Sequence, residues 1–482
     1  MSTLISLARA VAVERELAQP IRTVRHVHLA DRPLVFIPLA MAGEANAPLA
    51  AMLGDDPASA RLLTVAEPRD RDQRFAFAAE LAGIVLGYIE NSHAPQLIVP
   101  NPAGVTFTRL LGRSTRFRRT SGEWAVPAGV PLLGRWLTFF SERYEHPASS
   151  LMVAMTGALT EHWATGQSPV EDLSLGAVLG WVDPPSGMSG AQAAAAAEDP
   201  VVCPPAGPAT DPTFDNEVLE PRMLAIRTAG LTGDGRAYDR ARQAFDEALA
   251  TQLTPVWAMM WRAVDLLRRV PEAGHVRQRW TDDLDAVAWH AGHIGEGGPP
   301  QARRDGAVAA ARRLANMERI QEMVAVQRAF DDPLVMAEYR MTGAAFAGEV
   351  VHAEPDRVDG SGRRRVLRPR VTLVTSDDVS EQISASELTS PARPSQKARV
   401  VSLTAAGDQC RVTVELKGGM GRSLTPVPGS VPAVGERVCY AMVSDSYQNP
   451  PALPAPEDTP WTHGGPPPQY TPADDEARED WS

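Results

Sequence analysis

The spacing of apolar residues changes twice along this chain, and these changes constrain its fold more than any other feature. Up to about residue 112, short continuous apolar runs alternate with helical patterns, and from about residue 130 to 346 the spacing is helical. After Gly348, apolar and polar residues alternate with a period of two, which is typical of strands. We therefore predict an α+β multidomain protein, and its 482 residues suffice for several domains.

Residues 1–130 are predicted to form a small α/β layer of the doubly wound type. Three continuous runs rich in β-branched residues, at 34–37, 62–65 and 97–99, indicate strands covered on both faces, as in a parallel sheet. Apolar residues at three- and four-residue spacing predict a helix over residues 71–90. Shorter helical patterns follow the other two runs, at residues 47–53 and 105–111.

Residues 131–346 are predicted to form a central all-α bundle, interrupted by a loop rich in proline, glycine and alanine at residues 183–215. Thr254 followed by Pro255 is typical of an N-cap and a first helical residue, so a new helix is expected to begin there. The predicted helices cover residues 132–144, 149–165, 215–228, 236–252, 255–269, 276–292, 303–330 and 333–346.

Residues 347–448 are predicted to form a small five-stranded β-barrel of the OB or SH3-like kind. The strands are expected at residues 349–352, 370–374, 398–403, 410–416 and 437–440. Residues 449–482 form a proline-rich tail with seven acidic residues and one arginine. A segment of this composition cannot bury enough apolar surface to fold alone, so we predict a disordered tail.

The charge and composition exclude several kinds of chemistry. The net charge is −12, and about half of it belongs to the tail, so the acidity of the chain does not exclude a local basic surface. The only lysines are Lys397 and Lys417, which excludes a lysine base or Schiff base before residue 397. The patterns GxxxxGK[ST], GxGxxG, HExxH and GxSxG do not occur, and we predict no cofactor.

The cysteines and the apolar stretches bear on the compartment. Cys203, Cys410 and Cys439 are far apart and form no CxxC pair, which favours a reducing environment. No apolar stretch has the length of a signal-peptide core or of a membrane span. We expect a cytoplasmic protein without membrane contact.

Acidic and amide side chains follow the ends of the predicted parallel strands. Glu44, Glu67, Asp70, Asp72 and Asn101 come at the carboxyl edge, where open α/β sheets bind ligands. Their oxygens are suited to Mg²⁺ beside a nucleotide or a phosphorylated substrate. The alternative is that Asp70 and Asp72 only stabilise the start of a helix.

Two groups of arginines are candidates for contact with nucleic acid. Arginine binds phosphate in a bidentate manner, and the aromatics Phe107, Phe117 and Trp124, which accompany the first group, are suited to stacking on bases. The alternatives are a solvated helix end, an acidic partner, the chain's own tail, or a genome that favours arginine codons. The first group is Arg109, Arg113, Arg116, Arg118 and Arg119; the second is Arg363, Arg364, Arg365, Arg368 and Arg370.

Glu415-Leu416-Lys417, with Asp408 seven positions before Glu415, is similar to the local pattern of restriction-endonuclease-like nucleases. That resemblance implies acids that hold Mg²⁺ and a lysine that positions the attacking water. The alternative is a plain barrel strand, because Val412, Val414 and Leu416 alternate with the polar residues.

Three further side chains have a functional and a structural interpretation. His290 and His293 could bind a metal from one helix face, but no further ligand has a motif-like spacing, and we predict no metal. Trp461, within the tail, is predicted to bind a protein partner, unless it folds back onto the barrel.

These observations predict a non-enzymatic, nucleic-acid-associated adaptor. Its arginines would contact the phosphates of DNA or RNA, and its acidic tail would recruit a helicase- or nuclease-type protein. One alternative is a Mg²⁺-dependent enzyme that acts on a nucleotide or phosphorylated substrate at the carboxylate edge. The other is a structural scaffold without a ligand.

Overall fold

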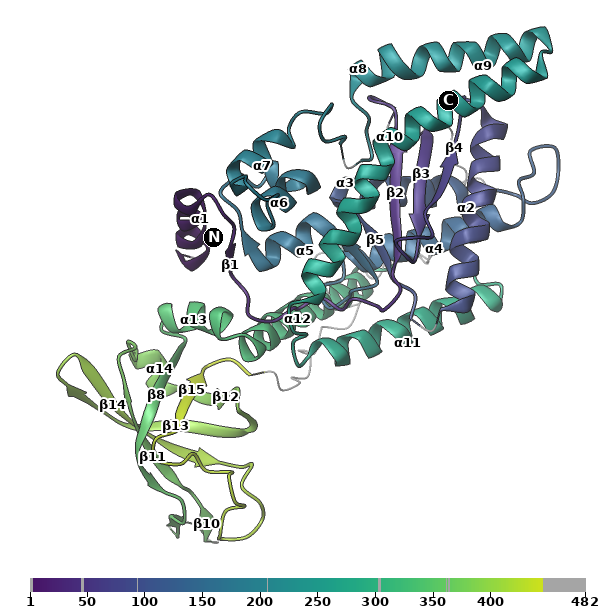
Figure 1. The fold of residues 1–482 in the computed structure, drawn as a ribbon. Helices are drawn as coiled ribbons and strands as arrows, with labels where there is room; N and C mark the ends of the chain where they lie inside the picture. The colour runs from purple at the N-terminus through teal and green to yellow at the C-terminus, as the bar shows by residue number, and fades with distance from the viewer. Residues whose placement is uncertain are drawn as a thin grey trace.

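Figure 1 shows a sheet surrounded by helices and, at one end of the molecule, a separate barrel of strands. The structure is a computed structural model. It describes residues 3–44, 47–92, 94–205, 207–301, 305–360, 362 and 365–444. The predicted disordered tail, residues 449–482, lies outside the described residues.

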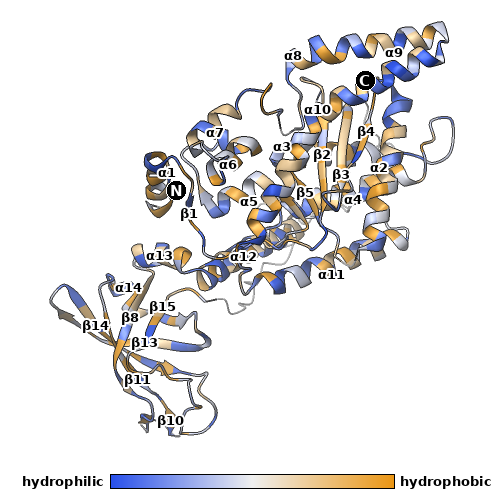
Figure 2. Ribbon diagram, viewed as in Figure 1, coloured by the Kyte–Doolittle hydropathy of each residue, from blue (hydrophilic) through white to orange (hydrophobic). Residues whose placement is uncertain are grey.

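The sheet has five strands in the order β4-β3-β2-β5-β6. They are β2 (Leu34–Ala40), β3 (Pro48–Gly54), β4 (Arg61–Thr64), β5 (Leu97–Val99) and β6 (Met152–Ala154). β2, β5 and β6 run parallel, whereas β3 is antiparallel to both β2 and β4, so the sheet is mixed. Every residue of β2 and β3 is buried, and Figure 2 shows apolar colouring along these central strands. The prediction that the run at 34–37 forms a strand covered on both faces is confirmed.

Different helices cover the two faces of the sheet. Along β2, Val35, Ile37 and Leu39 belong to one apolar core, while Leu34 and Phe36 belong to the other, as the alternation of side chains requires. The first core also contains residues of α5 (Met155–His162), α6 (Leu175–Val182), α9 (Glu220–Thr232) and α10 (Gly235–Arg268). The second contains residues of α2 (Arg71–Asn91), α3 (Pro102–Thr115) and α4 (Gly129–Tyr144).

Because α10 shares a core with the sheet, the sheet and the helices form one unit, which we call the body (residues 3–341), and not a sheet beside a separate bundle. Its remaining helices and strands are short or lie at its edges. They are α1 (Thr3–Arg15), β1 (Gln19–Pro20), which pairs with β7 (Trp163–Ala164), a 3₁₀ turn (Glu171–Leu173), α7 (Gly190–Ala196), α8 (Pro212–Phe214), a π-helical turn (Asp215–Leu219), α11 (Val276–Gly295), α12 (Ala307–Asp331) and α13 (Pro333–Met341).

Two predicted helices of the body contain strands. The prediction of a helix at residues 47–53 is wrong, because this segment is β3. It contains Ala50, Ala51, Met52 and Leu53, which favour helices in isolation, but pairing with β2 on one side and β4 on the other outweighs that preference. Likewise, the predicted helix at 149–165 is β6 followed by α5.

Three other predicted boundaries differ from the structure. The predicted break at Pro255 is wrong, because α10 continues through it. An internal proline costs a helix roughly 3 kcal/mol, but Leu253, Val256 and Met260 on either side are buried in the core and hold the helix together. The predicted loop at 183–215 contains α7, and the last predicted helix ends at Met341 and not at residue 346.

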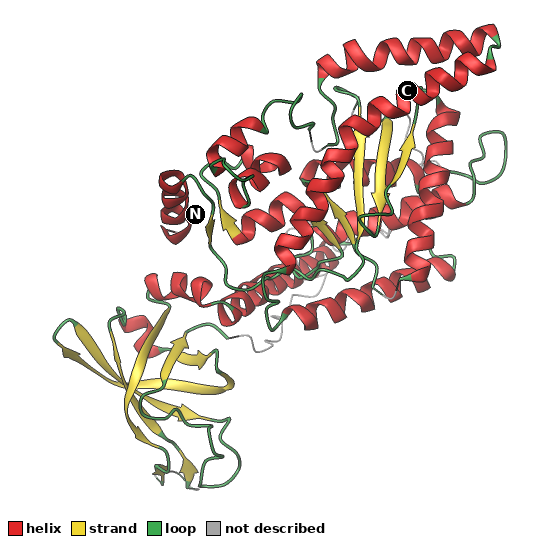
Figure 3. Cartoon of the chain, viewed as in Figure 1, coloured by secondary structure: helices red, strands yellow, loops and turns green. Residues whose placement is uncertain are grey.

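The barrel has six strands, not five, and is closed in the order β11-β14-β13-β12-β15-β8 (Figure 3). Its strands are β8 (Ala345–Glu354), β11 (Arg370–Thr375), β12 (Glu387–Ser390), β13 (Arg393–Ala406), β14 (Gln409–Lys417) and β15 (Arg437–Ala441). The missed strand, β12, has four residues and no alternating pattern, yet it joins β13 to β15 and so closes the barrel. Outside the ring, β9 (Val358–Asp359) pairs with β10 (Val366–Leu367).

The barrel has an apolar core of its own. Before β12, α14 (Glu381–Ala385) places Ile383 in that core with no exposed surface. The barrel meets the body mainly through α13, where Met336 packs beside Ala441 in a small apolar cluster and Arg340 forms a bidentate ion pair with Asp377 at 2.7 and 2.8 Å.

None of the described helices combines the length and the apolar character that crossing a lipid bilayer demands.

Candidate functional site

The side chains predicted at the carboxylate edge are engaged in separate local contacts. Asp70 caps α2 by accepting from the Gln73 backbone N–H at 2.8 Å, which matches the alternative role as a helix cap. Asn101 caps α3, accepting from the Gly104 N–H at 3.1 Å. Asp72 pairs with its neighbour Arg71 at 3.1 Å.

The two glutamates of that edge form ion pairs, and a loop lies across the strand ends. Glu44 pairs with Arg69, and Glu67 pairs with Arg227 at 2.8 Å. The loop before α8 forms a bridge with the end of β2 through Ala209. The buried Asp215, which begins the π-helical turn after α8, accepts from the Ala42 N–H at 2.8 Å. Across the residues that the structure describes, no group of three or more His, Cys, Asp or Glu side chains could hold a metal ion.

The nuclease-like pattern in the barrel does not converge on one point. Asp408 lies in the turn before β14, and Glu415 lies seven residues along that strand, about 23 Å away at the usual rise of a strand. Glu415 pairs with Arg357 at 2.7 Å and with Arg370 at 3.1 Å. Lys417 is exposed, while Val412, Val414 and Leu416 point into the core, as expected of a plain barrel strand.

The second arginine group lies around the β9–β10 hairpin, at the end of the barrel remote from the body (Figure 1). Arg363 and Arg364 lie outside the described residues. Arg365 is exposed, Arg368 donates to the Leu367 carbonyl at 3.0 Å, and Arg370 pairs with Glu415.

The two histidines of α11 have separate structural surroundings. His290 stacks on Phe139, with 4.3 Å between the ring centroids, and burial together with nearby Arg135 lowers its pKa to about 4. His293 stacks on Trp289 and lies 3.2 Å from the Pro299 carbonyl. Trp461 lies outside the described residues, so its predicted partner contact remains a prediction.

In the first arginine group, Arg109 and Arg116 make contacts within the body. Arg109 pairs with Glu145 at 2.6 Å. Arg116 is half-buried, and its guanidinium donates to Thr138 Oγ1 of α4 at 3.5 Å. Burial raises the pKa of the nearby Glu142 carboxyl, while Arg116 and Arg109 oppose that rise. These two arginines therefore help to hold α3 against α4.

Arg118 belongs to a stack in which guanidinium groups alternate with aromatic rings. The Arg71 guanidinium lies 5.4 Å from the Trp124 ring centroid and 4.9 Å from that of Phe75. The Arg118 guanidinium lies 5.2 Å from the Phe75 centroid. Each such contact is a cation–π interaction. Phe107, which the sequence had suggested for stacking, is buried in the core.

The stack is attached to a loop that we call the arginine loop (residues 116–126). The Val126 N–H donates to the Arg119 carbonyl at 2.9 Å and closes the loop, while Gly122 adopts a φ of 94° at its tip. Trp124 keeps 67% of its surface exposed, and Arg119 is exposed as well. In Figure 1 the loop lies at the right edge of the body, opposite the barrel at lower left, so it does not share one surface with the described arginines of the second group.

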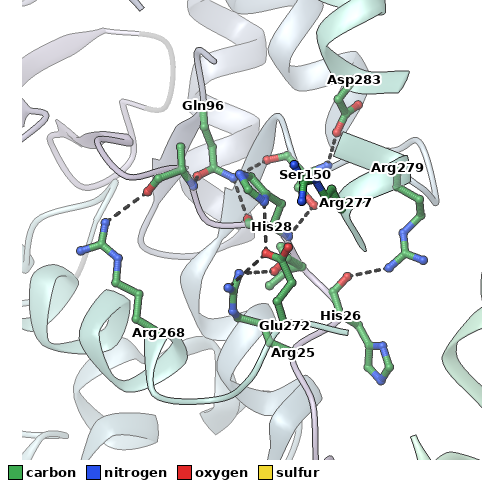
Figure 4. Close-up of polar contacts among 12 residues, drawn as sticks. Arg25, His26, His28, Gln96, Ser150, Arg268, Glu272, Arg277, Arg279 and Asp283 are labelled. Atoms are coloured by element: carbon green, nitrogen blue, oxygen red, sulfur yellow. Dashed lines mark hydrogen bonds and ion pairs between the residues drawn. The ribbon is translucent and has the colours of Figure 1, made fainter. Parts of the chain in front are cut away.

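A polar cluster that the sequence analysis missed lies where β2 and β5 begin (Figure 4). His28 Nδ1 lies 3.2 Å from Glu272 Oε2, and the same oxygen accepts from Arg25 at 3.2 Å. The His28 ring stacks on Trp280, with 4.2 Å between the centroids. The Gln96 amide donates to the His28 carbonyl at 2.8 Å. Burial lowers the pKa of His28, and Glu272 opposes this, so at pH 7 the imidazole is neutral.

No spacing in the sequence could have revealed this cluster, because its members come from positions 25 to 280 and meet only in the folded body.

No protein-family model, no curated protein and no solved structure matches this chain.

Proposed function

We propose that the protein associates with nucleic acid and that the arginine loop is its contact with a single strand. The observation that supports this most is the alternating stack of Trp124, Arg71, Phe75 and Arg118, with Trp124 largely exposed at its end.

The stack offers both interactions that a single strand needs. An exposed indole accepts a base on its ring face, and such stacking tolerates any base sequence. Arg119, exposed in the same loop, adds a guanidinium group for phosphate oxygens. A paired duplex would hide its base faces from Trp124, so we expect a preference for unpaired strands.

The loop is also preorganised. The hydrogen bond between Val126 and Arg119, and the one at 2.8 Å that Arg71 donates to the Trp124 carbonyl, fix the loop before binding. Ordering a flexible loop on binding costs affinity, and this loop avoids much of that cost.

The experiment measures the fluorescence anisotropy of a labelled 20-nucleotide single strand with the purified protein at about 50 and 200 mM salt. We expect binding that weakens steeply with salt. Trp124→Ala should weaken it about 5-fold or more, the loss of one stacked base. Trp289→Ala is the matched control, because Trp289 is 70% exposed on α11 and lies outside the arginine loop.

The proposal fails if no binding occurs at about 50 mM salt, or if Trp289→Ala weakens binding as much as Trp124→Ala does. The first result would favour the alternative of a scaffold without a ligand.

Recruitment of a helicase- or nuclease-type partner by the tail is the second half of the predicted adaptor role. It remains a prediction that rests on composition, because the tail lies outside the described residues. The Mg²⁺-dependent enzyme also remains a prediction, and the separate local contacts of Glu44, Glu67 and Asp70 lend it no support.

A further inference from the structure

A cleft of about 870 Å³ opens where β2 begins, at the edge of the sheet opposite the predicted carboxylate site. Its walls come from the start of β2, the connection between β3 and β4, the second half of α2, and Trp280 of α11. Gly83 and Gly87 of α2 line it, and a Cβ on either glycine would meet no atom within 4 Å. The volume lies within the range of sites that hold small molecules of metabolite size.

His28 lines this cleft in a fixed orientation. Its backbone N–H donates to Ser150 Oγ at 3.0 Å, its carbonyl accepts from Gln96, and its ring is held between Trp280 and Glu272. The Glu272 carboxylate accepts from Nδ1–H and so selects one tautomer of the neutral imidazole. Nε2 is then left with a lone pair that accepts a hydrogen bond, which suits a hydroxyl or an amine.

Two arginines also line the cleft. Arg32 pairs with Asp55 at 3.1 Å, which offsets its charge. Arg61, at the start of β4, is exposed and makes no side-chain ion pair or hydrogen bond with the residues that the structure describes. Arg61 is therefore the guanidinium that remains available for an anionic group.

We propose that this cleft binds a hydroxyl-bearing organic anion of sugar-phosphate or nucleotide size, with a hydroxyl donating to His28 Nε2 and the anionic group at Arg61. The oriented imidazole is also placed to accept a proton from that hydroxyl, as a general base does. This inference is independent of the arginine loop, because the cleft involves Gly83 to Asn91 of α2, whereas the stack involves Arg71 and Phe75 at its start.

The test is isothermal titration of the full chain with four probes: AMP, ribose 5-phosphate, adenosine and gluconate. We expect AMP or ribose 5-phosphate to bind, and adenosine, which lacks the anion, to bind at least about 10-fold more weakly, the loss of one charge-assisted hydrogen bond. Binding of gluconate as well would extend the anionic group to carboxylates.

Substitutions of His28 and Arg61 test whether both side chains contribute to binding. His28→Ala and Arg61→Ala should each weaken binding about 10-fold or more. Arg61→Ala removes a side chain without a partner among the described residues, so the test survives if His28→Ala does not fold. Arg312→Ala, an exposed arginine on α12, is the matched control and should leave the affinity unchanged.

The inference is overturned if every probe binds with a Kd weaker than about 10 mM, because a specific site of this size should bind its ligand more tightly than that. It is equally overturned if adenosine binds as well as AMP, or if Arg61→Ala and Arg312→Ala behave alike.

Discussion

The body and the barrel hold their chains together in different ways. In the body, buried charged side chains connect segments that are far apart in sequence: Asp283 accepts from Arg143 at 2.7 Å and from the Ser150 N–H at 2.6 Å. In the same way, Asp332 accepts from the Thr23 N–H at 2.8 Å. In the barrel, ladders between neighbouring strands surround a core that is mostly apolar.

This difference indicates where side chains from distant segments of the chain can come together to form a site. A buried ion pair costs desolvation and is directional, so it places segments in one register at little net gain in stability. The His28 cluster and the arginine loop both lie in the body, where distant segments are positioned in this way. The barrel arginines 368 and 370 instead contact their own hairpin or the next strand.

The largest expected effect is in the body. Asp283→Ala removes a carboxylate that is fully buried and leaves Arg143 and the Ser150 N–H without their acceptor. We expect the body to lose about 3–5 kcal/mol of unfolding free energy. Calorimetry of the full chain should show one transition lowered and the other, assigned to the barrel, unmoved. A single transition that shifts as a whole would contradict the division into two units.

In the barrel, the corresponding variant removes an apolar side chain from the core. Ile383→Ala leaves a cavity where α14 closes the core, and should cost about 2–5 kcal/mol. The same calorimetric scan should now show the other transition lowered. If Asp283→Ala and Ile383→Ala lower the same transition, the comparison is wrong.

Mild acid should distinguish the two units without any substitution. Burial lowers the pKa of His28, His146 and His162, and lowers that of His290 to about 4. The unfolded chain takes up these protons near pH 6.5 and the folded body does not, so the stability of the body falls as pH drops from about 6.5 towards 4.

One carboxyl of the body opposes the effect of these histidines. Glu142, whose pKa burial raises, works in the opposite direction, but it is one group against four. The described part of the barrel contains His352, which is exposed, as its only histidine. Lowering the pH from 7 to 6 and 5 should therefore reduce the transition temperature of the body, measured by calorimetry, more than that of the barrel. Equal shifts would count against the assignment of the two transitions.

The smallest effect is expected on the barrel surface. Glu415→Gln removes the charge that Arg357 and Arg370 share, in a group that solvent reaches. We expect a loss of about 0.2–1 kcal/mol from the barrel transition. A loss as large as that of Ile383→Ala would mean that this ion-pair group is an essential part of the barrel.

How much of the fold could be predicted depended on whether local pattern and tertiary contacts agreed. The helix at 71–90 and five barrel strands followed from their spacing, because each apolar stripe faces one core. β3 did not, because its alanines favour a helix until two neighbouring strands pair with it. Similarly, α10 continues through Pro255 because packing compensates for a local break.

The candidate site was less predictable than the fold. The arginines at 118 and 119 and Trp124 were identified from their density, but Arg71 and Phe75 lie on another helix, and only folding brings them into the stack. The prediction from sequence treated Arg116 as a phosphate contact, whereas it lies against α4. The pair of His28 and Glu272 spans 244 positions, and no local rule connects such residues.

We propose that the arginine loop of the body, and not the arginines of the barrel, binds single-stranded nucleic acid. The most direct measurement is the salt dependence of binding to a labelled single strand for the full chain, for Arg119→Ala/Trp124→Ala, and for Arg365→Ala. We predict that the double variant loses most of the affinity and lowers the slope of log K against log salt by about 1, because one phosphate contact is gone. Arg365→Ala should change the affinity by no more than about 2-fold and leave the slope unchanged. Loss of binding in Arg365→Ala with the double variant unaffected would contradict the claim.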